Sequence, residues 1–105
     1  MNAQPPARTP DGHHVVIEGR RWRATDPSIP DPVLRSLRHD LASARGTVGA
    51  AMRAGDDERE RAARRRVQVA KVGLGERGTP WWEQSPAQRQ QRWTTALAVL
   101  RDQNA

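Results

Sequence analysis

Arginine is the residue type with the clearest potential for chemistry in this chain, because its guanidinium group binds phosphate and carboxylate through paired hydrogen bonds. Residues 59–66 contain five arginines. At about 100° per residue a helix would spread them over three sides. An acidic residue also lies four positions before both Arg61 and Arg64, which is typical of surface ion pairs. We therefore interpret the segment as a solvated helix surface, with phosphate binding as the alternative. The candidate nucleic-acid-binding residues are Arg21, Arg23, Arg64, Arg65 and Arg66.

The four tryptophans are the second group of candidates, in a chain without Phe or Tyr. An indole beside arginine is typical of interface anchors and of platforms on which nucleic-acid bases stack. Trp81 and Trp82 are adjacent, so in an extended segment they point to opposite faces and one of them is expected to be exposed. They either close the open end of a helical hairpin or provide a recognition anchor, and the sequence leaves both alternatives open.

Val69 and Val72 form a second apolar surface on the helix that we expect over residues 57–75. The main apolar stripe of that helix consists of Ala63, Val67, Ala70 and Leu74. The two valines must be covered by the N-terminal strands or a third helix, or else by a protein partner or a second copy of the chain. The candidate partner-binding residues are Trp22, Val69, Val72, Trp81 and Trp82.

No group of residues has the spacing of a catalytic or metal-binding motif. The chain lacks cysteine, which removes thiolate metal sites and cysteine nucleophiles. His13 and His14 are adjacent, so they project to opposite faces of a strand, and no carboxylate follows at ligand spacing. The serines lie outside any nucleophile elbow, and the glycines of residues 73–78 follow a helix instead of a strand. We expect no enzyme, no metal and no cofactor, and we identify no small-molecule substrate.

The elements that must position these residues begin with a β-hairpin over residues 13–24. Apolar and aromatic residues flank Glu18 and Gly19, which form a two-residue turn. That turn places Val15 opposite Trp22, so the apolar face of the hairpin should lie on the helices.

Two long helices follow a proline-rich connector. Asp31 is the expected N-cap of the first helix, over residues 32–54, with Pro32 at its first position. Its apolar stripe ends at Met52 or Ala51, and Gly55 stops it. The second helix, over residues 57–75, follows after so short a connection that the two must pack antiparallel in the manner of a coiled coil.

A short third helix completes the predicted fold, over residues 86–103. Ser85 and Gln88 have the spacing of a capping box at its start. Residues 1–12, which contain three prolines and little apolar surface, are expected to be a disordered leader. The fold class is therefore mainly α (α+β), with a single small domain over residues 13–105.

Composition limits the location and the size of the core. At 105 residues and 35% apolar composition the chain can bury only one thin core. It has no apolar run long enough for a membrane span and no signal-peptide pattern, so we expect a cytoplasmic protein without membrane contact. The net charge of +6 favours polyanionic partners, although an arginine-rich composition also arises from GC-rich codon usage.

Two segments carry a resemblance to a protein family. GRRWRATDPSIP at residues 19–30 and AKVGLGERGTPWW at residues 70–82 resemble an uncharacterised family of short bacterial proteins, over about residues 13–82. Some of its members are labelled "biopolymer transporter Tol", a label that this sequence does not support, because it has neither a membrane anchor nor the repeated strands of a propeller. The resemblance implies a recurrent bacterial fold and no activity.

From the sequence we predict a small, non-enzymatic, cytoplasmic protein-interaction module that binds a protein partner or forms a homodimer. The alternative is a basic nucleic-acid-binding protein that contacts phosphates through arginines of the second helix and the β-hairpin.

Overall fold

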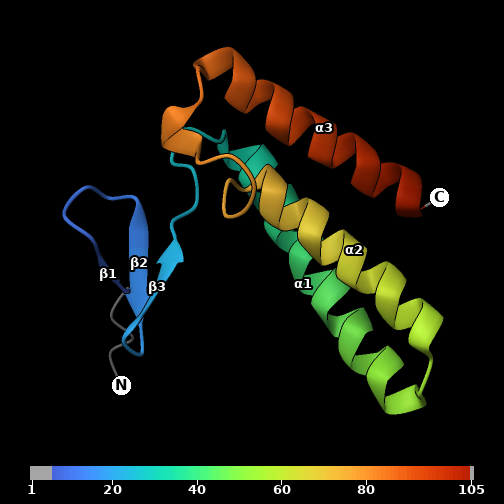
Figure 1. The fold of residues 1–105 in the computed structure, drawn as a ribbon. Helices are drawn as coiled ribbons and strands as arrows, with labels where there is room; N and C mark the ends of the chain where they lie inside the picture. Colours follow the sequence, from blue (N-terminus) through green and yellow to red (C-terminus); the bar gives the residue numbers. More distant parts are fainter. Residues whose placement is uncertain (1–5, 105) are drawn as a thin grey trace.

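The computed structural model describes residues 6–104, and the side chains of residues 6–102. It is mainly α, with a small antiparallel sheet packed against one end of a helical hairpin, which confirms the predicted fold class (Figure 1). The elements in chain order are β1 (Ala7–Arg8), β2 (His14–Ile17), β3 (Arg20–Arg23), α1 (Asp31–Ala54), α2 (Asp57–Gly73), the 3-10 helix η1 (Trp81–Glu83) and α3 (Pro86–Asn104). No helix among the described residues is both long and apolar enough to cross a membrane.

The β2–β3 hairpin has the predicted register, with Val15 opposite Trp22 and Ile17 opposite Arg20. Glu18 and Gly19 both adopt positive φ angles, of 52° and 78°, as a two-residue hairpin turn requires.

The predicted disordered leader is wrong for the part that the structure describes. Within residues 6–12, β1 pairs with β2 and places Arg8 opposite Val15. The following turn is closed by a hydrogen bond from the amide of Gly12 to the carbonyl of Thr9, at 2.8 Å. Backbone pairing orders this segment without apolar burial, and that is why composition did not indicate it. Residues 1–5 of the predicted leader lie outside the described residues.

The antiparallel pair α1–α2 is confirmed (Figure 1). Gly55 ends α1 in the left-handed conformation, at φ 68°, and the Asp56 carboxylate then accepts a hydrogen bond from the amide of Arg59 at 3.0 Å. Of the two residues expected at the end of the α1 stripe, Ala51 is buried and Met52 is exposed.

The start of α1 differs from its prediction. Asp31 is already helical, and the residue before it, Pro30, stands at the N-cap without a side-chain cap. The Pro30 carbonyl accepts from the amide of Leu34 at 2.9 Å, so this backbone bond closes the first turn. The Asp31 carboxylate instead lies within the first turn, where it interacts favourably with the helix dipole.

The core joins α3 and the connector before α1 to the helical hairpin. Its fully buried leucines are Leu37 of α1, Leu74 after α2 and Leu100 of α3. Ser85 and Gln88 form the predicted capping box at the start of α3, with reciprocal hydrogen bonds of 3.2 and 2.8 Å. The third helix is therefore an integral part of the domain.

Candidate functional site

Two adjoining hollows lie along the junction of the sheet and the helical hairpin, and they share Arg45 and Lys71. The first, about 440 Å³, separates the Trp22 face of the sheet from the helices, and the second, about 510 Å³, continues between α1 and α2. We call the two together the basic trough. Among the described residues its lining includes seven cationic side chains and one acidic side chain: Arg8, Arg23, Arg38, Arg45, Arg64, Lys71, Arg77 and Glu76.

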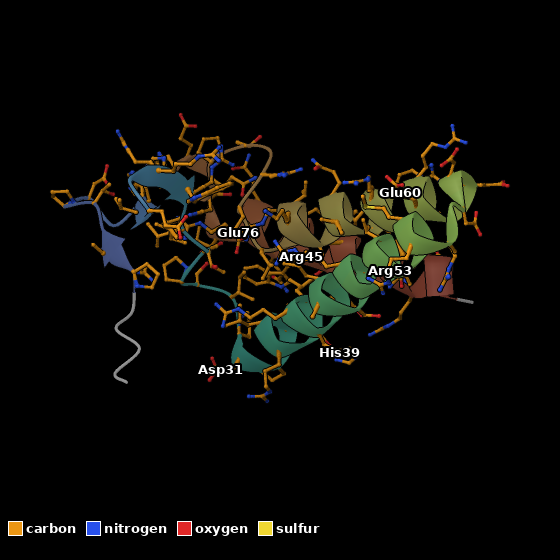
Figure 2. The ribbon with its side chains drawn as sticks, turned by 90° about the horizontal axis from the view of Figure 1, so that it is seen from below. Asp31, His39, Arg45, Arg53, Glu60 and Glu76 are labelled. Carbon is orange, nitrogen blue, oxygen red and sulfur yellow. The ribbon has the colours of Figure 1, made fainter. Side chains whose placement is uncertain are left out.

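Helical spacing explains how the trough gathers its charge. Arg38 and Arg45 are seven residues apart on α1, and Arg64 and Lys71 are seven residues apart on α2. Seven residues are close to two helical turns, so each pair lies on one side of its helix. Figure 2 shows Arg45 between Glu76, on the side of the sheet, and Arg53, which lies toward the far end of the hairpin.

Positive charge in the trough is not balanced by its single acid. Burial, followed by the repulsion of Arg77 and Arg45, lowers the pKa of Lys71 below its ordinary value, and Glu76 opposes this only in part. The Glu76 carboxylate also accepts a hydrogen bond from the Thr25 hydroxyl at 2.7 Å. Arg64 is ion-paired with Glu60, but the other cations of the lining still outnumber Glu76, so the trough attracts anions.

Trp22 is the exposed aromatic side chain of the trough. It is 42% exposed, and Ile17 on the same face of the sheet is 45% exposed. The guanidinium of Arg20 lies 4.8 Å and the ammonium of Lys71 lies 5.9 Å from the centroid of its ring. The predicted packing of this face on the helices is thus a partial contact through Lys71, across an open hollow.

The tryptophan pair after α2 has divided roles. Trp81 is only 8% exposed, and its indole N–H donates to the carbonyl of Ala24 at 2.9 Å. Trp82 is half-buried and stacks on the imidazole of His13, with ring centroids 3.9 Å apart. Arg23 adds a second tie between the sheet and this end of the hairpin, because it donates to the carbonyl of Gly78 at 2.7 Å. Trp81 is a core residue, and both tryptophans are used within the chain.

A buried ionic cluster around Asp26 fastens α3 to the connector, and no motif in the sequence pointed to it. Arg92, whose side chain is 6% exposed, donates to Asp26 at 2.6 Å, and Arg89 approaches the other carboxylate oxygen at 3.4 Å. The amide and the hydroxyl of Ser28 also donate to this carboxylate, at 2.8 and 2.7 Å. Burial raises the pKa of Asp26, but the hydrogen bonds from Ser28 and Arg92 outweigh burial and hold it below the ordinary value.

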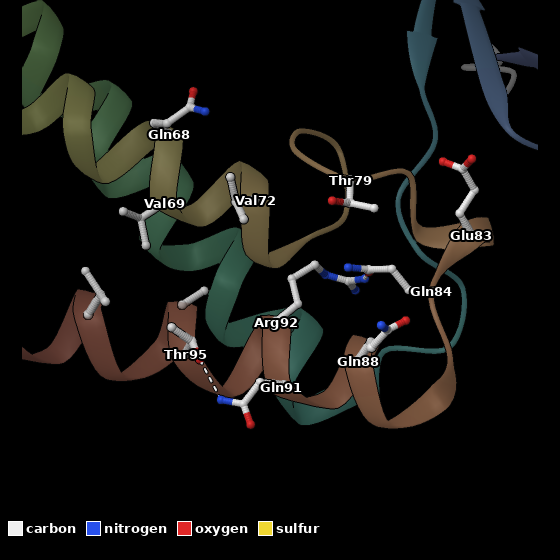
Figure 3. A pocket seen from close by; sticks show the side chains of 12 residues that line it. Gln68, Val69, Val72, Thr79, Glu83, Gln84, Gln88, Gln91, Arg92 and Thr95 are labelled. Carbon is white, nitrogen blue, oxygen red and sulfur yellow. Dashed lines mark hydrogen bonds between the residues drawn. The ribbon is translucent and has the colours of Figure 1, made fainter.

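A different groove, of about 630 Å³, lies between α2 and α3. Val69 and Val72 point into it from α2, and Ala96 and Val99 line it from α3 (Figure 3). Glutamine and threonine side chains form most of its remaining lining, namely Gln68, Gln84, Gln88, Gln91, Thr79 and Thr95. The third helix therefore covers Val69 and Val72 only in part, and we call this hollow the α2–α3 groove.

The structure does not bring either predicted set of site residues together. Of the basic set, Arg23 and Arg64 line the trough, and Arg64 is paired with Glu60 at 2.8 Å. Arg21 points to the face of the sheet opposite Trp22, while Arg65 is exposed on α2 outside the trough lining. Arg66 is half-buried on α2 and is not part of that lining either. The partner set is divided as well: Trp22 lines the trough, Val69 and Val72 line the α2–α3 groove, Trp81 is in the core, and Trp82 is stacked on His13.

Sequence reasoning missed five of the trough cations, namely Arg8, Arg38, Arg45, Lys71 and Arg77. The seven-residue spacing within each helix was an available signal, but the apposition of the helices and the sheet was not. Among the described residues, no three His, Asp or Glu side chains are grouped closely enough to hold a metal ion. No protein-family model, no curated protein and no solved structure matches the chain.

Proposed function

We propose that this chain is a non-enzymatic, cytoplasmic binding protein whose basic trough holds a polyanion. The observation that carries the proposal is the gathering of seven cationic side chains and one acidic side chain around two joined hollows, among the residues described. Chains of phosphate are suited to such a site, because the planar guanidinium group of arginine donates two hydrogen bonds to one phosphate.

The test compares two double variants that remove equal charge from the same two helices. Arg45→Ala/Lys71→Ala removes the two cations that both hollows of the trough share. Arg53→Ala/Arg61→Ala removes two exposed cations that do not line the trough. Binding of inorganic polyphosphate is measured by calorimetry at two salt concentrations, with circular dichroism to confirm folding. We expect the trough variant to weaken binding by about tenfold and the control variant to weaken it far less.

Equal losses in the two variants would mean that binding reflects only the net charge, and this would overturn the proposed site. Absence of binding by the unaltered protein at low salt would overturn the function itself.

A second candidate function is self-association across the α2–α3 groove, and the low charge of the groove favours it. A chain of net charge +6 repels its own copy, so a homodimer is best formed through an uncharged face. Among the described residues the groove includes only two charged side chains, Glu83 and Arg92. Arg92 is neutralised by Asp26 at 2.6 Å. The valines of the groove would then be buried against those of the second copy.

Sedimentation velocity over a range of concentrations tests this candidate. Val99→Glu places a charge in the groove, and Ala98→Glu places the same charge on the exposed side of α3. We expect a dimer that Val99→Glu dissociates and Ala98→Glu preserves. A monomer at every concentration would overturn self-association.

A further inference from the structure

We infer that the polyanion is a single-stranded nucleic acid, one base of which stacks on the indole of Trp22. This inference rests on the proposed function of the basic trough, and it adds the class of ligand. Its starting point is that an exposed aromatic side chain lies within the cationic lining instead of elsewhere on the surface.

Trp22 differs from the other indoles of the chain in being available. Trp81 is buried and hydrogen-bonded, Trp82 is stacked on His13, and Trp93 is half-buried against the core. Among the tryptophans that the structure describes, Trp22 is the one whose side chain is exposed. A side chain of this size exposed in a cationic hollow is suited to a ligand that has both negative charge and a flat apolar face.

Two cations lie over the ring of Trp22, Arg20 on the sheet at 4.8 Å and Lys71 on the helical side of the trough at 5.9 Å from the ring centroid. A base that stacks on the indole takes the place of one of these cations, which then lies beside the base and can contact its phosphate. From Lys71 the lining continues to Arg45 and then to Arg64, along the helical hairpin. A flexible strand can follow this path, with its phosphates on the arginines and one base turned onto Trp22.

Base stacking selects a single strand, because the faces of paired bases are already covered by their neighbours in a duplex. A polyphosphate chain or an acidic peptide would satisfy the cations but would leave Trp22 and Ile17, both more than 40% exposed, in water. The exposed indole therefore favours the ligand that has bases.

The experiment separates the charge of the ligand from its bases. Fluorescence anisotropy is recorded with oligodeoxythymidylate of about 12 nucleotides, with an abasic oligomer of the same length and with a duplex. Unlabelled inorganic polyphosphate and polyglutamate serve as competitors. The variants are Trp22→Leu, which keeps an apolar partner for Val15, and Trp22→Phe, which keeps a smaller aromatic face.

We expect the unaltered protein to bind the oligonucleotide about tenfold more tightly than the abasic oligomer. Trp22→Leu should abolish this preference without changing affinity for the abasic oligomer, and Trp22→Phe should restore part of it. Equal affinity for the oligonucleotide and the abasic oligomer would overturn the inference and leave a polyanion site. Tighter binding of the duplex than of the oligonucleotide, or stronger competition by polyglutamate than by polyphosphate, would overturn it as well. Failure of every probe to bind would overturn the proposed function itself.

Discussion

The basic trough and the α2–α3 groove are formed on two different sides of the same helix, and they have opposite chemical character. Gln68 of α2 lines both. On one side of it, Arg64 and Lys71 face a hollow to which α1 and the sheet add further cations. On the other side, Val69 and Val72 face α3, which adds mainly amides and apolar groups.

The difference shows that the elements packed opposite a helix decide the charge of each surface. When α2 is considered alone, the arginines of residues 59–66 lie on three sides of the helix and indicate no site. The trough is cationic because α1 and the sheet add cations to those of α2. The groove has little charge because Arg92 is paired with Asp26, which leaves Glu83 as the other charged side chain of its described lining.

The largest effect is expected when the ion pair between Arg92 and Asp26 is broken. Arg92→Ala leaves the buried carboxylate of Asp26 without its closest cation, at 2.6 Å in the native protein. Breaking one side of a buried pair costs about 3–5 kcal/mol, and urea unfolding measures it. Arg101→Ala, at an exposed position of the same helix, is the control and should change stability by less than about 0.5 kcal/mol.

The acid dependence of stability tests the same pair. Because the pKa of Asp26 is lower in the folded chain than its ordinary 3.8, the hydrogen bonds that Ser28 and Arg92 donate to its carboxylate contribute stability above about pH 4. That contribution is lost as the pH falls further, through the pKa of the folded state. Asp26→Asn should remove this part of the acid dependence, and an unchanged acid profile would show that the pair contributes little.

An intermediate effect is expected where α2 meets α3. A β-carbon on Gly73 would lie 2.7 Å from that of Ala96 and 3.0 Å from a methyl group of Leu37. Gly73→Ala should therefore cost about 1–3 kcal/mol through overpacking, despite its better helix propensity. Gly46→Ala meets open space in α1 and should instead stabilise the fold by up to about 1 kcal/mol.

The Gly73→Ala variant also tests whether the basic trough and the α2–α3 groove act independently. Gly73→Ala disturbs the packing beside the α2–α3 groove, so polyanion affinity of the trough should remain within about twofold if the two sides act independently. A large loss of polyanion affinity would show that the structure of the trough depends on how α3 packs against α2.

Local structure was predictable from the sequence to the extent that neighbouring residues determine it. The Glu18–Gly19 turn fixed the Val15–Trp22 pair, and the Ser85–Gln88 capping box was found from its spacing. These features depend on residues only a few positions apart.

The sites escaped prediction because they are assembled from distant segments. Asp26 meets Arg92 across 66 residues, and Trp22 meets Lys71 across 49. No local pattern specifies these contacts, since they follow from how the connector, the sheet and α3 pack together. The exposed state of Trp22 likewise depends on the hollow left between the sheet and the helices.

The smallest expected effect is electrostatic and concerns Lys71. Its pKa is lowered by burial and by the repulsion of Arg77 and Arg45, so Lys71→Met should raise stability at low salt, by less than about 1 kcal/mol because solvent screens the charges. The gain should shrink with added salt, and also as the pH rises from the lowered pKa through the ordinary value of 10.5, above which wild-type Lys71 is neutral in both states. Urea unfolding measures both trends, with Arg61→Met as an exposed control. A loss of stability in Lys71→Met would show instead that the contact of the ammonium with Trp22, at 5.9 Å, outweighs the repulsion in the trough.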